Sequence, residues 1–260
     1  MKLRQIQALY LGREPVIVYQ MAKVGSSAVV DALNRSGLPV FHVHRMDSGH
    51  LDRMRRERDA LGWLIPPMTP GDRMGLKLQE RVVARRRPAK FVTLVRDPIT
   101  RNLSSYFEHL DFIWRRKRAH ATVPVEDLCS GFMERFPTTE PLTWFDDELL
   151  PVMGIDAYRH PFPGSGHLRI EREPFSVLIL KSESADEVKR AALSRFLGVN
   201  VAALRRTNST ERKAKGEVYR QFLERLRLPV DYVESMLDAR HTRHFYDAAE
   251  RAAIRRRFLW

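Results

Sequence analysis

The chain has 260 residues, enough to bury one sizeable core but short for two independent domains. It carries 45 Lys and Arg against 32 Asp and Glu, a formal net charge of +13, which attracts anions such as nucleotides, acidic glycans, nucleic acids and membrane surfaces without choosing among them. The single cysteine, Cys129, excludes an intrachain disulfide and a thiolate metal cluster, and this favours a reducing compartment.

The first residues have a basic start, but Arg13 and Glu14 interrupt them before an adequate apolar segment develops. The sequence therefore does not predict a cleaved signal peptide. No stretch approaches the roughly 18 uninterrupted apolar residues of a membrane span. We expect a soluble, cytoplasmic protein, and we leave peripheral contact with a membrane open.

The chain opens with the pattern of a strand followed by a helix. Residues 16–19 form a short β-branched and aromatic run that is typical of a buried strand. A helix is predicted to follow, with Ser26 or Ser27 as its N-cap and Gly37 as the left-handed residue beyond its end.

The alternation of strands and helices continues along the chain. Residues 40–44 predict a second short strand, and 50–62 and 72–87 predict basic amphipathic helices. Residues 91–95 form the clearest central strand. Asp97 followed by Pro98 predicts the start of the next helix, with Asp97 as N-cap and proline in the first turn.

The middle of the chain is harder to assign. Residues 111–175 are rich in proline, aromatic and charged residues and too long for a plain connection, so we expect an irregular insertion around the mouth of a site. Residues 177–180 predict another buried strand, followed by a capping box at 184–187 and a helix. Residues 205–216 are polar and basic and predict a loop.

Helical patterns return after this loop, and a second capping box at 247–250 begins the last helix. Alternating strands and helices predict an α/β fold with a mostly parallel sheet, whose ligands bind at the carboxyl ends of the strands. We treat residues 1–260 as one domain with 111–175 inserted into it.

A short polar turn, residues 23–27, separates the first strand from the first helix. Unpaired backbone N–H groups and the helix dipole make such a turn an anion site. Gly25 permits close approach, Ser26 and Ser27 add hydroxyl donors, and Lys23 adds a charge. A nucleotide-triphosphate P-loop would instead place its lysine after the last glycine. The same residues also fit an ordinary strand-to-helix turn.

A second candidate site follows the strand at 91–95. Arg96 ends this buried strand, where a guanidinium without an anionic partner is costly, and Ser104 lies in the following helix. Helical spacing places Ser104 on one face with Arg101 and Glu108. The pair predicts a clamp for a second phosphate, whereas pairing of Arg96 with a neighbouring carboxylate is the structural alternative.

Both stretches resemble the nucleotide motifs of sulfotransferases that use 3′-phosphoadenosine 5′-phosphosulfate (PAPS). Lys23-Val-Gly-Ser-Ser27 resembles their 5′-phosphosulfate loop, and Arg96-Asp-Pro98 with Arg101 and Ser104-Ser-Tyr106 resembles their 3′-phosphate motif. The longer stretch 93–107 is similar to the capsular polysaccharide synthesis proteins of bacteria, a family that belongs with the sulfotransferases. Three further stretches are similar to the same family: 144–149, 154–156 and 244–260.

The resemblance implies a P-loop-like, three-layer α/β/α sandwich that uses PAPS, releases adenosine 3′,5′-bisphosphate and needs no metal. It also implies which residues hold the nucleotide. The 5′-phosphosulfate would be held by four residues of the turn: Lys23, Gly25, Ser26 and Ser27. The 3′-phosphate would be held by Arg96 and Ser104.

Sulfotransferases also close a basic loop over the nucleotide late in the chain. Residues 208–216 occupy the corresponding place, and Lys213 and Lys215 are the candidate contacts. A solvated charged loop is the alternative for either lysine.

Sulfuryl transfer needs an in-line acceptor oxygen, stabilisation of the charge that builds on the leaving phosphate, and a base for the acceptor proton. Lys23 is the candidate for the second role. His42 and His44 share a face of their strand, and this segment is similar to the one that carries the catalytic histidine of uronyl 2-O-sulfotransferases, so His44 is the predicted base. The alternatives are a structural role for this histidine and a carboxylate base: Glu108, Asp146, Asp147 or Glu148.

The acceptor is predicted to meet the insertion at 111–175, where aromatic and basic side chains combine stacking surfaces with positive charge. This mixture suits a carbohydrate, including an anionic one. The candidate contacts are Trp114, Arg115, Arg116, Lys117, Arg118, Trp144 and Tyr158. A basic helix end and tryptophans of the core are the alternative for these residues. We expect a bacterial sulfotransferase that acts on a carbohydrate hydroxyl by in-line displacement.

Two other function classes fit part of the pattern. A kinase-like or other nucleotide-dependent phosphate-handling α/β enzyme is disfavoured by the missing GK[ST] motif and by the Arg96/Ser104 pair. A non-enzymatic protein that binds anionic polymers would use the positive charge. However, no RNP, KH, zinc or helix-turn-helix signature is found, so we expect no specific nucleic-acid partner.

Overall fold

The computed structural model describes residues 3–205 and 211–259, and the side chains of 211–214 lie outside the described part. The chain divides into two compact units, which are described separately. The first comprises residues 1–51, 68–96 and 144–207. The second comprises residues 52–67, 97–143 and 208–260. The stretch 111–175 is thus shared between the two units.

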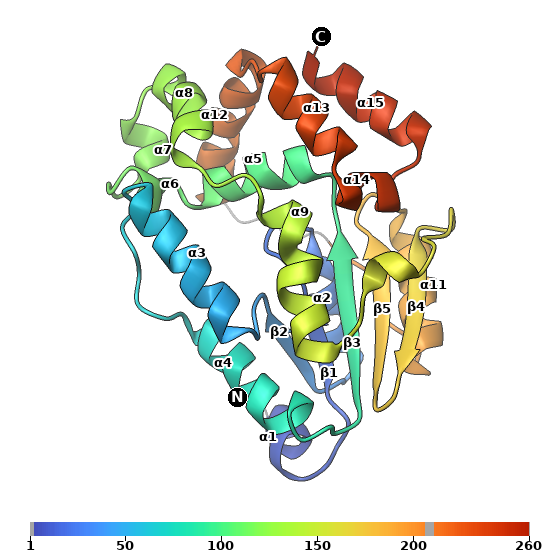
Figure 1. Cartoon of the computed structure of the whole chain (residues 1–260). Coiled ribbons are helices and arrows are strands. Elements are labelled where there is room, and N and C mark those ends of the chain that lie inside the picture. The colour runs from blue at the N-terminus through green and yellow to red at the C-terminus, as the bar shows by residue number, and fades with distance from the viewer. Residues whose placement is uncertain (1–2, 206–210, 260) are drawn as a thin grey trace. The chain divides into compact units, whose positions relative to one another are not determined.

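The first unit is built on a mostly parallel sheet (Figure 1). Among the described residues this sheet has five strands in the order β2-β1-β3-β5-β4. β1 pairs in parallel with β2 and β3, β3 pairs in parallel with β5, and β4 runs antiparallel to β5. This confirms the predicted α/β fold class. The strands are β1 (Val16–Tyr19), β2 (Val40–Val43), β3 (Ala89–Val95), β4 (His167–Arg172) and β5 (Phe175–Lys181).

The apolar runs that predict the strands are buried in the sheet. All four residues of β1 are buried, as are nearly all residues of β3 and β5. A parallel sheet covered on both faces requires such continuous apolar runs. β4 is not predicted from the sequence, because its residues HLRIER mix charged and apolar side chains at the edge of the sheet.

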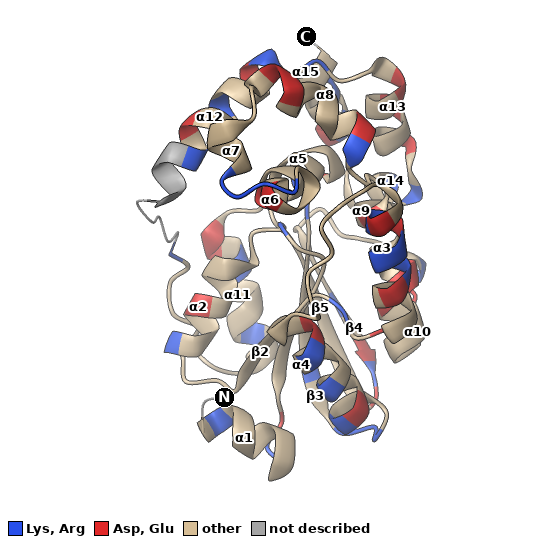
Figure 2. Ribbon diagram, turned by 90° about the vertical axis from the view of Figure 1, so that its left-hand side faces the viewer, with Lys and Arg blue, Asp and Glu red and all other residues tan. Residues whose placement is uncertain are grey.

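Helices cover both faces of this sheet. α2 (Ser26–Arg35) and α11 (Asp186–Leu197) lie on one face, and α4 (Pro70–Leu78) and α10 (Leu150–Met153) lie on the other (Figure 2). The unit also contains the first turn of α3 (Ser48–Ala60) and four short elements: α1 (Leu3–Tyr10), η1 (Gln79–Val83), η2 (Phe145–Leu149) and η3 (Ala157–Arg159).

The second unit is helical in its described residues and packs around an aromatic cluster. Tyr106, Phe107, Phe132 and Phe222 are buried at its centre, and their rings lie 5.5 to 5.9 Å apart where they touch. Besides the rest of α3, its helices are α5 (Pro98–Glu108), α6 (Leu110–Ile113), α7 (Ala119–Thr122), α8 (Val125–Arg135), α9 (Glu140–Trp144), α12 (Glu211–Arg225), α13 (Val230–Asp238), α14 (Arg240–Phe245) and α15 (Ala248–Leu259).

Two loop predictions are wrong. Residues 111–175 are largely helical rather than irregular, because apolar side chains such as Leu128 and Phe132 fall at helical spacing and become buried. The loop expected at 205–216 is shorter, since α12 begins at Glu211. Residues 206–210 lie outside the described part of the chain.

The two predicted capping boxes differ in outcome. At the start of α15, the Asp247 and Glu250 side chains each accept the other residue's backbone N–H, as predicted. α11 instead begins after Ala185 without a side-chain cap, and the hydroxyl of Ser184 lies close to Gly166. The capping box predicted at 184–187 is therefore wrong.

Candidate functional site

β2 and β3 pair with opposite sides of β1, so the order of the strands reverses at β1. From β1 the chain passes through α2 to β2, whereas β3 lies on the other side of β1 and is followed in the sheet by β5. Ligands of open α/β sheets bind outside the carboxyl ends of the strands at such a switch point. Residues 23–27 follow β1 and Arg96 follows β3, so both candidate motifs reach this edge.

Residues 23–27, the glycine turn, have an unusual backbone. Lys23 has a φ of +70° and Gly25 a φ of +83°, both in the left-handed region that L side chains rarely adopt. Gly25 is the N-cap of α2 and makes no side-chain capping bond. The prediction that Ser26 or Ser27 caps this helix is therefore wrong. The first backbone N–H groups of α2 have no carbonyl of their own helix to bind.

Two side chains from neighbouring strand ends hold the glycine turn in place. Arg96 Nη1 donates a hydrogen bond of 2.8 Å to the carbonyl oxygen of Lys23. The hydroxyl of Ser182, just after β5, donates one of 2.6 Å to the carbonyl oxygen of Val24. A Cβ at Gly25 would stand 3.0 Å from the Ser182 hydroxyl, so both the backbone angle and the available space favour glycine here.

The other predicted nucleotide contacts belong to the second unit. Ser104 lies in α5, and Lys213 and Lys215 lie in α12, so their participation in the clamp stays a prediction. The ammonium of Lys215 lies 3.8 Å from the carboxylate of Glu108. The side chain of Lys213 lies outside the described part of the chain.

Helical spacing predicts that Arg101 shares an outward face with Glu108, and this prediction is wrong. The side chain of Arg101 is fully buried and bonds the carboxylate of Glu140 and, at 3.1 Å, the amide oxygen of Asn102. Glu108 is exposed. The charge of Arg101 is thus paired inside the second unit, and removal of Glu140 would leave it buried without compensation.

His42, in β2, and His44, directly after β2, are the two histidines near the glycine turn. Their rings are 4.9 Å apart, which confirms that His42 and His44 share a face. His42 Nε2 lies 3.2 Å from the hydroxyl of Ser26 and 3.3 Å from the side-chain nitrogen of Gln20. His44 Nδ1 lies 2.9 Å from the backbone carbonyl oxygen of Gln20.

A carbonyl oxygen only accepts, so His44 Nδ1 donates to the backbone oxygen of Gln20. In a neutral ring with this proton position, Nε2 is the nitrogen with the lone pair that a general base uses. Partial desolvation of the His42 ring, and then the nearby His44, lower the pKa of His42 to about 4. His42 is therefore neutral at pH 7, although the residue is exposed.

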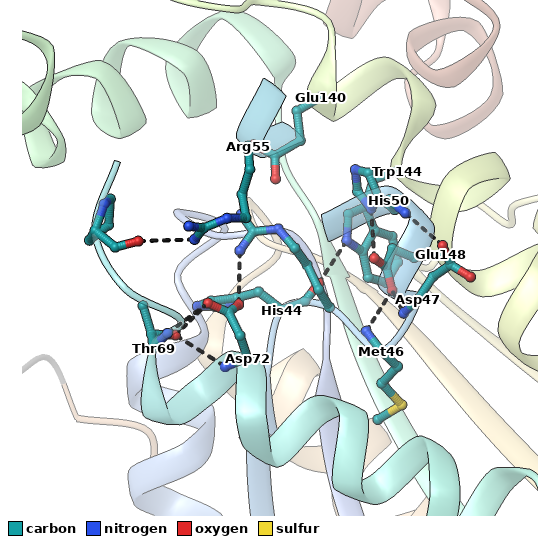
Figure 3. A network of polar contacts seen from close by, with 12 residues as sticks. His44, Met46, Asp47, His50, Arg55, Thr69, Asp72, Glu140, Trp144 and Glu148 are labelled. Carbon is teal, nitrogen blue, oxygen red and sulfur yellow. Dashed lines mark hydrogen bonds and ion pairs between the residues drawn. The ribbon is translucent and has the colours of Figure 1, made fainter. Parts of the chain in front are cut away.

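A second polar cluster, the Glu148 cluster, lies after β2 (Figure 3). Glu148 Oε2 accepts the backbone N–H groups of Met46, at 2.8 Å, and Asp47, at 3.1 Å, and the hydroxyl of Tyr19. Glu148 Oε1 lies 2.6 Å from His50 Nδ1. Burial, and then the charge of Glu148, raise the pKa of Tyr19 well above its usual value, so this phenol stays a donor.

The side chain of Glu148 is fully buried. Its two oxygens are occupied by donors from β1 and from the segment after β2. This carboxylate holds that segment in place. Neither Tyr19 nor His50 is singled out by the sequence analysis, because their positions in a strand and a helix do not identify a shared acceptor.

Trp144 is also structural, contrary to its predicted role as a stacking surface for the acceptor. It is fully buried, and its indole Nε1 donates a hydrogen bond of 3.1 Å to the backbone oxygen of His44. The side chains of 115–118 in the second unit are exposed, as a surface that meets a ligand would be. Trp114 and Tyr158 are half-buried.

No group of three or more His, Cys, Asp or Glu side chains in the described residues is arranged to hold a metal ion. No helix in the same part of the chain has the length and apolar character to cross a membrane.

Residues 127–247 match the family described as "Putative capsular polysaccharide synthesis protein". This range contains 144–149, with both Trp144 and Glu148, and also 154–156. The glycine turn and Arg96 lie outside it. No curated protein and no solved structure matches the chain.

Proposed function

We propose that the protein is a PAPS-dependent sulfotransferase that moves a sulfuryl group to a hydroxyl of a carbohydrate. The observation that carries this proposal is the 2.8 Å hydrogen bond from Arg96 to the carbonyl oxygen of Lys23, which are 73 positions apart in the sequence. The segments that resemble the 5′ and 3′ nucleotide motifs therefore start from one corner of the sheet. This corner is the switch point, where ligands of such sheets bind.

The glycine turn suits the phosphosulfate end of PAPS. The N–H groups at the start of α2, the hydroxyls of Ser26 and Ser27 and the ammonium of Lys23 are donors for a compact anion. Gly25 adopts the left-handed backbone of the turn, with a φ of +83°, at no steric cost. PAPS would supply the sulfuryl group and a phosphate leaving group. Arg96 and Ser104, with Lys213 and Lys215, are the proposed contacts to the rest of the nucleotide.

The proposed reaction assigns a role to each polar residue near the turn. His44 Nε2 takes the proton of the acceptor hydroxyl as the new bond to sulfur forms. Lys23 holds the negative charge that develops on the oxygen released from sulfur. Gln20 and Trp144 orient His44 by binding its Nδ1 and its backbone oxygen. These roles involve no metal ion.

The carbohydrate acceptor is inferred from the matched family and from charge. The family's description concerns capsular polysaccharide synthesis, and a protein with a net charge of +13 attracts acidic sugar chains. The exposed basic run 115–118 is the proposed meeting place for such a chain. We also propose the sulfotransferase-like sandwich for the fold, a single domain for the whole chain, and the cytoplasm of a bacterium as the site of action.

Transfer from labelled PAPS to a panel of acidic and neutral polysaccharides tests the proposal. The wild-type protein should label at least one of them, and Lys23→Ala should lower turnover about 100-fold, as expected when one donor to a developing charge is lost. Lys90→Ala is the matched control, because Lys90 lies near the start of β3, at the opposite edge of the sheet, and pairs with Glu14 at 3.9 Å. Equal turnover of the two variants would contradict the proposal.

A further inference from the structure

Helix α1 is attached to the first unit through one of its faces. Ala8 and Leu9 are buried, and the side-chain nitrogen of Gln5 donates a hydrogen bond of 2.6 Å to the backbone oxygen of Val40. Arg87 closes the end of this helix, with hydrogen bonds of 2.7 Å to the backbone oxygens of both Ala8 and Leu9. This buried face is the apolar face through which an amphipathic surface helix normally packs on its own protein.

The opposite face of α1 is apolar as well. Leu3, Ile6 and Tyr10 follow the i, i+3, i+7 spacing and point away from the buried face, and their exposed fractions are 70%, 38% and 47%. Leu11, directly after the helix, is 74% exposed. These four residues, the α1 patch, are exposed large apolar side chains on one short segment. Such contiguous exposure in a surface helix indicates an interaction site.

Basic side chains border the α1 patch. The ammonium of Lys77, in α4, lies 5.2 Å from the centre of the Tyr10 ring, and the guanidinium of Arg81, in η1, lies 5.7 Å from it. Arg87 lies at the end of α1. Figure 2 shows α1 as mainly uncharged beside α4, which carries basic residues. Apolar side chains next to cations are the pattern of a helix that lies in the interface of an anionic membrane.

We propose that the α1 patch docks the protein on the surface of a membrane that contains anionic lipids. Leu3, Ile6 and Leu11 would enter the boundary of the acyl chains, Tyr10 would lie at the level of the headgroups, and the cations would meet lipid phosphates. A second copy of this chain is disfavoured as the occupant, because a two-fold contact through the patch would bring the two sets of cations together.

This docking is compatible with a site at the carboxyl edge of the sheet. α1 is bonded to Val40, the first residue of β2, and therefore lies near the amino ends of the strands. The glycine turn follows the last residue of β1, at the other edge of the first unit (Figure 1). A membrane on the α1 patch thus leaves the glycine turn accessible from solution.

Vesicle flotation tests this proposal without any activity measurement. The wild-type protein should float with vesicles of phosphatidylcholine and phosphatidylglycerol and much less with phosphatidylcholine alone. Leu3→Ser/Leu11→Ser should lower binding to the anionic vesicles at least about tenfold, because two exposed leucines no longer enter the bilayer. The matched control is Val188→Ser/Val199→Ser, which removes two apolar side chains of 39% and 38% exposure elsewhere in the unit; its binding should equal that of the wild type.

Three results would overturn the proposal. The first is wild-type protein that does not float with anionic vesicles. The second is equal vesicle binding by the Leu3→Ser/Leu11→Ser variant and the wild type, because binding would then come from the overall positive charge alone. The third is a wild-type dimer in light scattering that this double variant abolishes, since a second copy would then cover the patch. Circular dichroism of the variant should match the wild type because both leucines are exposed.

Discussion

Two polar clusters lie at the ends of neighbouring strands of the first unit, and they differ in where their hydrogen bonds go. In the Glu148 cluster, a fully buried carboxylate accepts donors from Tyr19, Met46, Asp47 and His50. In the glycine turn, the carbonyls of Lys23 and Val24 are bonded by Arg96 and Ser182, while α2 starts without a side-chain cap.

This difference separates a structural cluster from a binding site. Both oxygens of the Glu148 carboxylate accept hydrogen bonds from the protein itself, so this carboxylate holds chain segments together. The glycine turn is held in place by hydrogen bonds to its carbonyl oxygens. Its N–H groups begin a helix at the ends of the strands, where an anion is stabilised. A polar or acidic motif in a sequence indicates chemistry only when its partners are known.

The largest effect is expected where the Glu148 cluster is disrupted. Glu148→Ala removes the acceptor of two backbone N–H groups, a phenol and His50, all in the interior, and should lower the free energy of unfolding by about 3–5 kcal/mol. Urea unfolding measures this change. Asp146→Ala is the control because Asp146 is exposed in the same short helix, and its effect should stay within about 0.5 kcal/mol. Equal losses for the two variants would show that the cluster does not hold the fold together.

The next effect concerns the base beside the glycine turn. His44→Asn should lower kcat about 100-fold or more and leave nucleotide affinity unchanged, since a general base acts only in the transfer step. Glu108→Gln should leave kcat within about twofold, because Glu108 is exposed and pairs with Lys215. Kinetics with labelled PAPS separate the two residues. Loss of kcat in Glu108→Gln together with normal turnover of His44→Asn would transfer the role of the base to the carboxylate.

A smaller effect distinguishes backbone strain from the loss of the anion site. Gly12 and Gly25 have φ values of +82° and +83°, and nothing lies within 4 Å of a Cβ added at Gly12. Each Gly→Ala change should cost about 1–2 kcal/mol of stability through the left-handed backbone alone. Only Gly25→Ala should also remove the rise in Tm caused by adenosine 3′,5′-bisphosphate. If both variants keep that rise, the glycine turn does not hold the nucleotide.

The smallest effect is a pH dependence that arises beside the glycine turn. The pKa of His42 lies at about 4 against an ordinary value of 6.5, so as pH falls from 6.5 toward 4 the unfolded chain takes up a proton that the folded protein does not. Stability contributed by His42 is therefore complete above pH 6.5 and declines as the solution becomes more acidic. A histidine NMR titration measures the pKa directly. Titration of His42 near 6.5 would show that its ring is not desolvated beside Ser26.

The sequence predicts the framework of the site better than its contacts. Continuous apolar runs identify β1, β2, β3 and β5, and parallel strand order brings residues 23–27 and Arg96 to one edge. Periodicity does not reveal β4, which mixes charged and apolar residues at an edge. The bond between Arg96 and the carbonyl of Lys23 depends on the backbone of the turn, which sequence spacing does not specify.

The acidic run at 146–148 illustrates the same limit. Asp146 and Glu148 are close in the sequence, yet the first is exposed and the second fully buried. Glu148 lies four positions after Trp144, and this spacing is the one signal that both side chains turn inward. It does not reveal that Glu148 binds the segment after β2, because those partners lie about a hundred positions away in the chain.

The most direct test of a nucleotide site at the glycine turn is calorimetric titration with adenosine 3′,5′-bisphosphate, compared with ATP and Mg²⁺. The wild-type protein should bind the bisphosphate saturably and more tightly than ATP, and Arg96→Ala should bind it at least about tenfold more weakly, because a charge-assisted contact and the support of the turn are both lost. No binding of the bisphosphate, or tighter binding of ATP with Mg²⁺, would contradict the account.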